Sequence, residues 1–165
     1  MARQNLIGAQ ICDGVNANPA KISIVQIWNP VDSGVNFFVE MIGTAWNASS
    51  AVQSALSNMM GWDLNFGDEM LGDGVEGNPV RWLVDKDASN VTPSAIQMRN
   101  KLSATPYPAF RLIGEHWRAK MKDTTFRRFT SPLLLPPGYG LQVRPSNPNV
   151  YNIVDVEGYT EPVVG

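Results

Sequence analysis

The chain has 165 residues and a formal net charge of −2, with 44% apolar and 17% charged residues. This length fits one domain of ordinary size, and the apolar content excludes a disordered chain. One cysteine and one histidine exclude a disulfide framework and a zinc site built on His and Cys. No apolar run reaches the roughly 18 residues of a membrane-spanning helix. The charged content is below the usual ~25%, which indicates that much of the surface contacts other protein.

The charges are distributed unevenly along the chain. Residues 1–97 hold four Lys or Arg against ten Asp or Glu, a net charge of −6, whereas residues 98–165 hold nine against five, a net charge of +4. A chain with oppositely charged halves can pair head to tail with its own copies or attach to an oppositely charged surface. The alternative is that the two halves mix in space once the chain is folded. We expect a homo-oligomer and keep the mixed arrangement open.

The first 20 residues show no sustained hydrophobic periodicity. Gly8, Gly14 and Pro19 argue against a helix, and the segment has no signal-peptide hydrophobic region, so synthesis in the cytoplasm is expected. We expect an extended N-terminal arm over residues 1–20, followed by a single domain over residues 21–165. Arms of this kind often bind a neighbouring subunit, although frayed termini are equally common.

Two β-prone runs flank a turn segment near the start of the domain. Residues 21–28 and 35–42 are rich in β-branched and aromatic side chains. Between them, Pro30 has a fixed φ angle and Gly34 can adopt a positive φ angle, and both properties favour a turn. The pattern predicts a β-hairpin.

The rest of the chain reads mostly as short strands. Val52, Leu56 and Met59 recur at spacings of three and four, which predicts a short helix within residues 47–60. About eight short strands, with at most one or two short helices, predict a mainly β chain folded as an antiparallel β-sandwich or jelly roll. The later strand candidates are residues 80–84, 95–99 and 116–122, two strands within 131–144, and residues 150–156.

Residues 116–122 alternate strictly between apolar and polar side chains. Trp117, Ala119 and Met121 share one side of the predicted strand, and the opposite side is basic. Three interpretations of the basic cluster stay open: a surface for an acidic protein, a phosphate contact with nucleic acid, and a solvated strand face. The pI of 5.3 argues against nucleic acid. The candidate protein-interface residues are Arg118, Lys120, Lys122, Arg127 and Arg128, together with Trp46 and Trp62, which flank the expected helix.

The sequence shows no catalytic pattern. His116 lies among cations on its predicted strand, and there is no Gly-x-Ser-x-Gly elbow, Walker A loop or Rossmann fingerprint. We therefore expect no enzymatic activity, no cofactor and no metal ion. A Gly-rich acidic stretch lacks the EF-hand spacing, so a solvated loop is favoured over a calcium site. Its carboxylates are Asp63, Asp68, Glu69, Asp73 and Glu76.

Three segments carry a further pattern. They are the turn over residues 27–36, the Pro-Pro-Gly-Tyr-Gly turn within Leu135–Arg144, and the terminal strand over residues 150–161. They resemble the Asn-Pro-x-x-Ser-Gly-Lys-Asn hairpin, the Leu-x-Pro-Gly-Glu-Gly-Leu turn and the closing strand of small β-sandwich virion proteins of tailed bacteriophages. Val35 and Tyr139 stand where that family usually has Lys and Glu.

The resemblance implies a structural protein of the virion that works by binding another virion protein. The specific expectation is a capsid decoration, or cement, protein that stabilises the head by binding the major capsid protein. The alternative is a jelly-roll binding module of a tail or fibre that recognises a carbohydrate or a receptor. Neither a membrane nor nucleic acid is an expected partner, and the expected location is the virion.

Overall fold

The computed structural model describes residues 3–13, 21–47, 59–68, 70, 82–87, 89, 91–92, 94–103, 111–120, 124–147 and 149–164. Residues 59–60, 91–92, 103 and 111–120 are described by their backbone alone. Eleven strands lie in this part of the chain. They are β1 (Gln4–Asp13), β2 (Ile22–Asn29), β3 (Val35–Asn47), β4 (Met59–Gly67), β5 (Trp82–Val84), β6 (Val91–Thr92), β7 (Gln97–Ser103), β8 (Arg111–Lys120), β9 (Thr125–Leu135), β10 (Tyr139–Pro145) and β11 (Tyr151–Pro162).

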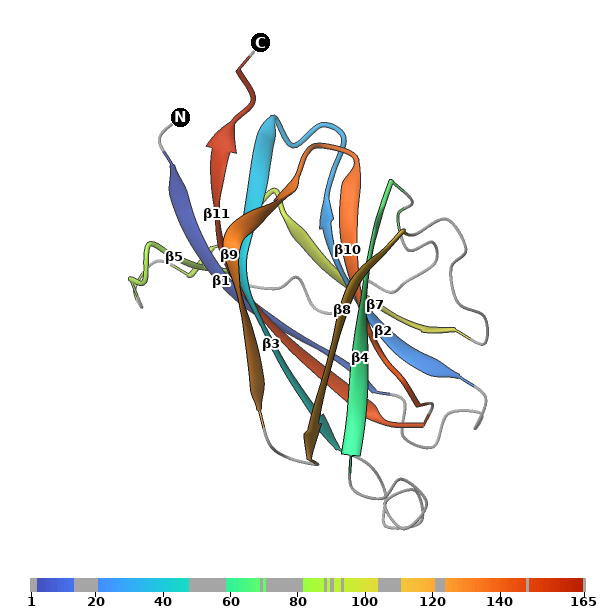
Figure 1. Ribbon diagram of the computed structural model, residues 1–165. Coiled ribbons are helices and arrows are strands. Elements are labelled where there is room, and N and C mark those ends of the chain that lie inside the picture. The colour runs from blue at the N-terminus through green and yellow to red at the C-terminus, as the bar shows by residue number, and fades with distance from the viewer. Residues whose placement is uncertain are drawn as a thin grey trace.

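The strands form two antiparallel sheets that pack face to face (Figure 1). The order is β6-β5-β1-β11-β3-β9 in the six-stranded sheet and β7-β2-β10-β4-β8 in the five-stranded sheet. Without β5, β6 and β7, eight strands remain, and they pair as in one long hairpin: β1 with β11, β2 with β10, β3 with β9 and β4 with β8. This hairpin rolled into two sheets is a jelly roll. The predicted mainly β sandwich is confirmed, with β5–β7 inserted between β4 and β8.

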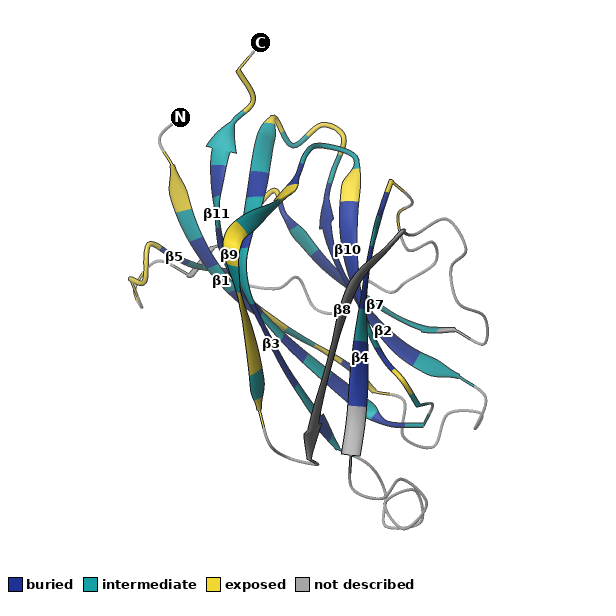
Figure 2. Cartoon of the chain, viewed as in Figure 1, coloured by how far each residue is buried: buried dark blue, intermediate teal, exposed yellow. Residues whose placement is uncertain are grey.

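The core lies between the two sheets (Figure 2). In β11 the even-numbered residues from Asn152 to Thr160 are buried, and the odd-numbered ones are half-buried. Nδ2 of Asn152 donates to the carbonyl oxygens of Ser23 and Val143, each at 3.0 Å. Its Oδ1 accepts from Nε1 of Trp62 at 3.1 Å. This buried amide therefore ties strands of both sheets together, and its donors and acceptor are all satisfied.

The N-terminal segment belongs to the sandwich. β1 lies between β11 and β5, and all ten of its residues pair with β11. Leu6 is completely buried in the core. The prediction of an arm over residues 1–20, ahead of a domain over residues 21–165, is therefore wrong for residues 4–13. Residues 14–20 lie outside the described part of the chain.

Gly8 explains why β1 lacks a clear apolar pattern. A Cβ atom built on Gly8 would lie 2.8 Å from the indole ring of Trp82 in β5. Trp82 also packs edge-on against Phe37, with ring centroids 5.9 Å apart, and its Nε1 donates to the carbonyl oxygen of Ile96 at 2.9 Å. Gly8 thus leaves room for Trp82 of the inserted segment. The hydrophobicity of β1 alone does not reveal this contact.

The predicted hairpin of β2 and β3 is wrong, although both strands exist. β2 lies between β7 and β10 in the five-stranded sheet, whereas β3 lies between β11 and β9 in the six-stranded sheet. The turn between them therefore crosses from one sheet to the other. Seven of the eight residues of β2 are buried, so both faces of this strand are covered.

The helix expected within residues 47–60 falls mostly outside the described residues. Asn47 is the last residue of β3, and Met59 begins β4. Residues 48–58 are not described. In the part of the chain that is described, no helix is long and apolar enough to cross a membrane.

The two turn motifs of the sequence meet at one end of the sandwich. Nδ2 of Asn29 donates to the carbonyl oxygens of Val35 and Leu135, each at 2.8 Å. The backbone N–H of Gly138 donates to the carbonyl oxygen of Asn29, also at 2.8 Å. Gly138 and Gly34 have φ angles of +82° and +68°, which glycine adopts readily. The motifs therefore form one hydrogen-bonded unit and have a structural role.

Candidate protein-interaction surfaces

The two edge strands that carry the predicted basic cluster border the same side of the sandwich. β8 is the last strand of the five-stranded sheet, and β9 is the last strand of the six-stranded sheet (Figure 1). Arg127 and Arg128 of β9 are exposed, as an interface requires. Phe126, next to them, is 60% exposed. We call Phe126, Arg127 and Arg128 the basic edge.

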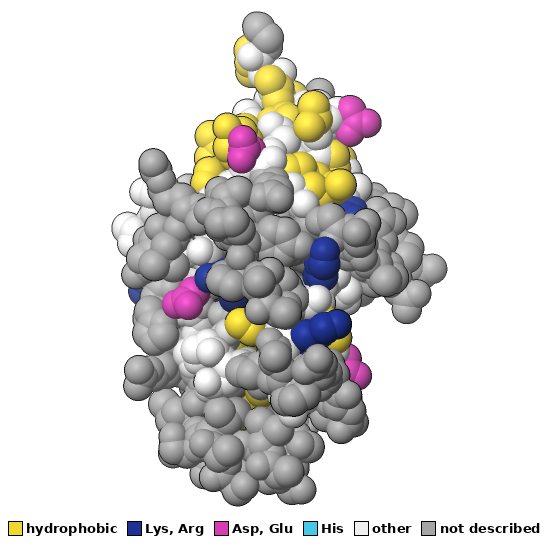
Figure 3. All heavy atoms as spheres, turned by 90° about the vertical axis from the view of Figure 1, so that its right-hand side faces the viewer, with side chains coloured by type: hydrophobic (Ala, Val, Ile, Leu, Met, Phe, Trp, Pro, Cys, Tyr) yellow, Lys and Arg dark blue, Asp and Glu magenta, His cyan; other side chains and the backbone are white. Residues whose placement is uncertain are grey.

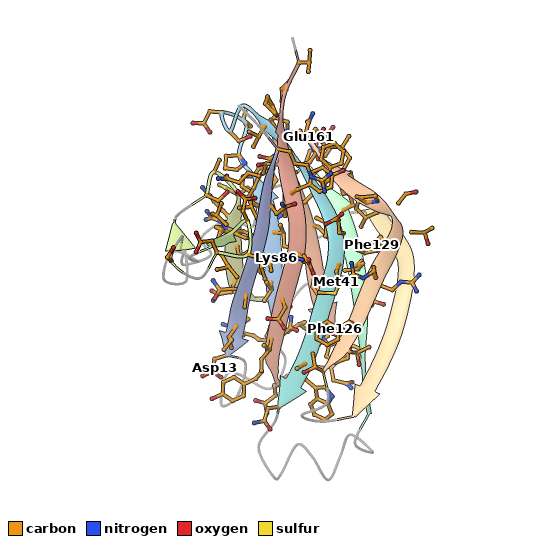
Figure 4. The ribbon with its side chains drawn as sticks, turned by 90° about the vertical axis from the view of Figure 1, so that its left-hand side faces the viewer. Asp13, Met41, Lys86, Phe126, Phe129 and Glu161 are labelled. Carbon is orange, nitrogen blue, oxygen red and sulfur yellow. The ribbon has the colours of Figure 1, made fainter. Side chains whose placement is uncertain are left out.

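Arg128 belongs to a small charge cluster on the outer face of the six-stranded sheet, together with Lys86 and beside Met41, both of which Figure 4 labels. Its Nη2 lies 3.9 Å from a carboxylate oxygen of Glu157 and 3.7 Å from Sδ of Met41. Lys86 of the insertion pairs with the same carboxylate at 3.4 Å. Because the Arg128 side chain is 67% exposed, the pair stabilises the fold little and leaves the guanidinium accessible to a partner.

Phe126 lies against the sheet beside an acidic residue. The Cβ position built on Gly43 is 2.9 Å from the ring of Phe126 and 3.3 Å from Cβ of Asp155. The glycine therefore lets the ring settle onto β3. Burial raises the pKa of the Asp155 carboxyl. An exposed aromatic ring next to arginines is a composition enriched in protein interfaces.

Part of the predicted cluster is described by its backbone alone. Trp117 of β8 pairs in register with Trp62 of β4, and Trp62 is completely buried. The inward position of Trp117 stays a prediction, because its side chain lies outside the described part. The side chains of Arg118 and Lys120, and all of Lys122, lie outside the described part.

A pair of variants tests the predicted faces of β8. Changing Arg118, Lys120 and Lys122 together to Gln should barely alter the free energy of unfolding, because exposed charges contribute little. It should weaken binding to an acidic partner and flatten the salt dependence of that binding. Trp117→Ala should cost about 3–5 kcal/mol, because it empties a core position. Thermal melts of both variants test the predicted faces. If the Gln variant is unfolded and Trp117→Ala is stable, the two faces of the strand are the reverse of those predicted.

Trp46 and Trp62 do not lie on the surface. Both side chains are completely buried, and Trp62 donates its hydrogen bond to Asn152 in the core. Their prediction as interface residues is wrong, because each belongs to a strand and takes an inward position there. The alternation of Trp62, Leu64 and Phe66 in the sequence is the signal that indicates this burial.

A second surface, which the sequence did not indicate, lies at the end of the sandwich that holds the turn motifs. Its side chains come from the β2–β3 turn, from the two strands that flank the β9–β10 turn, and from the residues that follow β11. The backbone N–H of Val163 donates to the carbonyl oxygen of Gly34 at 3.1 Å, which joins the last of these segments to the first. Figure 3 shows hydrophobic side chains gathered at this end. We call the exposed members the apolar end: Val31, Leu134, Tyr139, Val163 and Val164.

The apolar end has the composition of an interaction site. Val31 is 77% exposed and Leu134 is 45% exposed. Clustered apolar side chains on the surface of a protein commonly mark an interaction site. The charged residues that the turn and the end of β11 contribute are both acidic, Asp32 and Glu161. No sequence pattern reveals this surface, because three distant segments build it.

Among the described residues, the groups capable of chemistry do not gather into a site. Asp63 lies in β4 opposite Arg144 of β10, while Glu69 and residues 71–81 of the acidic stretch are outside the described part. No group of three or more metal-ligating side chains occurs in the described ranges. Burial raises the pKa of the Cys12 thiol to about 12, so this cysteine stays protonated and is a poor nucleophile.

Comparisons with known proteins add no relative to this picture. No family model matches the chain, and no curated protein and no solved structure matches it. The fold and the two surfaces are therefore the basis on which a function is proposed.

Proposed function

We propose that this protein is a non-enzymatic structural component of a virus particle, and specifically a decoration protein that stabilises the head by binding the major capsid protein. The jelly roll supports this proposal, because viral capsid proteins and lectins are among the proteins built on it. A fold alone does not assign a function. The resemblance of residues 27–36 and Leu135–Arg144 to bacteriophage virion proteins gives the proposal its specific form.

The observation that carries the proposal is the presence of two separate exposed surfaces on one sandwich, the basic edge and the apolar end, which we interpret as adhesive. Phe126 of the basic edge lies near the start of β9, and Leu134 of the apolar end lies near its end. A strand advances about 3.3 Å per residue, which separates these two side chains by roughly 25 Å. A protein with two surfaces this far apart can hold two neighbours at once, and this is the task of a cement protein.

The amount of the protein in purified virions tests the proposal. A decoration protein binds a symmetric shell and is therefore present in a fixed molar ratio to the capsid protein. In purified virions that contain this chain, we expect a stained gel to show the two proteins in amounts of the same order. Absence from washed virions would contradict the proposal, and so would an amount far below that of the capsid protein.

The jelly roll also fits a second candidate, a tail- or fibre-associated module that binds a carbohydrate or a receptor, because lectins use this fold as well. Gln142 of β10 stands in register beside Gln26 and Asn65. All three amides are buried, so this row offers a sugar no accessible surface. The same gel separates the candidates, because a fibre component is present in far fewer copies than the capsid protein.

A further inference from the structure

The apolar end is an exposed surface with a defined chemical character. Val31 and Val164 are 77% and 93% exposed, and Asp32 and Glu161 add negative charge beside them. In Figure 3 the hydrophobic cluster has acidic side chains next to it, and the Lys and Arg side chains lie lower on the same face. Arg3 forms an ion pair with Glu40 at 3.8 Å, and because these two charges cancel, the pair leaves the net negative charge of this surface unchanged. The surface therefore fits a partner with an apolar contact and positive charge.

The basic edge offers that combination on the same chain. Phe126 is exposed, and Arg127 and Arg128 follow it directly. The two surfaces cannot meet within one molecule, because they lie toward opposite ends of β9; Figure 4 shows Phe126 and Glu161 far apart along the sheet. They can meet only between two copies.

We propose that the apolar end of one copy of this chain binds the basic edge of the next copy. Phe126 packs against the exposed valines Val31 and Val164, while Asp32 and Glu161 face Arg128, which lies on the same face of β9 as Phe126. Arg128 gives up a 3.9 Å pair with Glu157 that is exposed and therefore weak, so this exchange costs little.

The symmetry of the assembly follows from the difference between the surfaces. A contact between two unlike surfaces is heterologous, so each copy uses one surface and leaves the other free for a third copy. Such a contact continues into a closed ring or an open filament. This inference names a partner for the two adhesive surfaces of the proposed function, but it needs no other virion component and is tested on the purified protein.

Two variants separate the surfaces. The first carries Val31→Asp and Val164→Asp, and the second carries Phe126→Ser and Arg128→Glu. All four positions are exposed, so both variants should remain folded, which a thermal melt of each checks. By light scattering, we expect the unchanged protein to show masses above the 18.1 kDa of one chain that rise with concentration. Each variant should associate at least about tenfold more weakly, because central aromatic and arginine contacts dominate interface energies.

Mixing the variants gives the decisive result. The first variant keeps its basic edge and the second keeps its apolar end, so an equimolar mixture should form a dimer and nothing larger. Ile11→Asp is the matched control, since Ile11 is also exposed but lies outside both surfaces; it should assemble as the unchanged protein does. An unchanged protein that stays monomeric, a second variant that still oligomerises, or a mixture without dimer would each overturn the proposal.

Salt provides a test that needs no substitution. Because ion pairs contribute to the contact, association of the unchanged protein should weaken as NaCl is raised from about 0.05 M to about 0.5 M. Association that does not respond to salt would overturn the pairing of acidic and basic groups. If the purified protein is monomeric but abundant in virions, the contact between copies is overturned and the proposed capsid attachment stands. If the protein oligomerises but is absent from virions, the proposed capsid attachment is overturned and the contact between copies stands.

Discussion

A chain that lacks residues 2–13 is expected to remain unfolded, because this deletion removes β1 from the middle of the six-stranded sheet. All ten residues of β1 pair with β11, and two also pair with β5. The deletion removes buried Leu6 and Cys12 as well. Each hydrogen bond of the ladder contributes a net ~0.5–1.5 kcal/mol, and a buried leucine contributes ~1.5–3 kcal/mol. The lost contributions add up to the whole free energy of unfolding of a typical domain, ~5–15 kcal/mol.

Far-UV circular dichroism and a thermal melt check this expectation. The shortened chain should give no cooperative unfolding transition. Gln4→Ala is the control within the same strand, since Gln4 is exposed and its substitution should shift the free energy of unfolding by less than about 0.5 kcal/mol. A shortened chain that melts within a few degrees of the full chain would show that the segment is a dispensable arm, as its sequence pattern indicates.

Asn152→Leu is expected to cost about 3 kcal/mol or more of the free energy of unfolding. The substitution leaves the indole N–H of Trp62 without its acceptor and takes a donor from the carbonyl oxygens of Ser23 and Val143. Each buried polar group left unsatisfied costs about 1–3 kcal/mol. The apolar leucine offsets part of this loss by burial, but it has no group that can replace the three hydrogen bonds.

Urea unfolding of Asn152→Leu measures this cost. Ile153→Ala is the matched control, because Ile153 is the next residue of β11 and is only half-buried on the outer face. We expect it to cost about 1 kcal/mol or less. Equal stability of the two variants would mean that the hydrogen bonds of Asn152 do not hold the sheets together.

Local patterns predicted those features that depend on neighbouring residues alone. The alternation of β11, with Val154 and Val156 on its inner side, marks a strand between core and surface, and several such segments establish the mainly β class. The turn at Gly138 was likewise predicted from its prolines and glycines, and the positive φ of Gly138 is a conformation that favours glycine. The exposure of Arg127 and Arg128 follows the same logic, since charged side chains are mostly found at the surface.

Only the tertiary structure decided how the strands pair and which surfaces result. Gly8 resembles a loop residue in sequence, yet it lies in a central strand because Trp82 from the insertion fills the space above it. β2 and β3 follow each other closely but enter different sheets, because each finds its hydrogen-bonding partners in strands that come much later in the chain. The apolar end joins Val31 to Val163 for the same reason. Hydrophobic periodicity indicates whether a residue faces the core, but it does not indicate which distant segment lies beside it. Strand pairing and surfaces built from several segments depend on which distant segments come together.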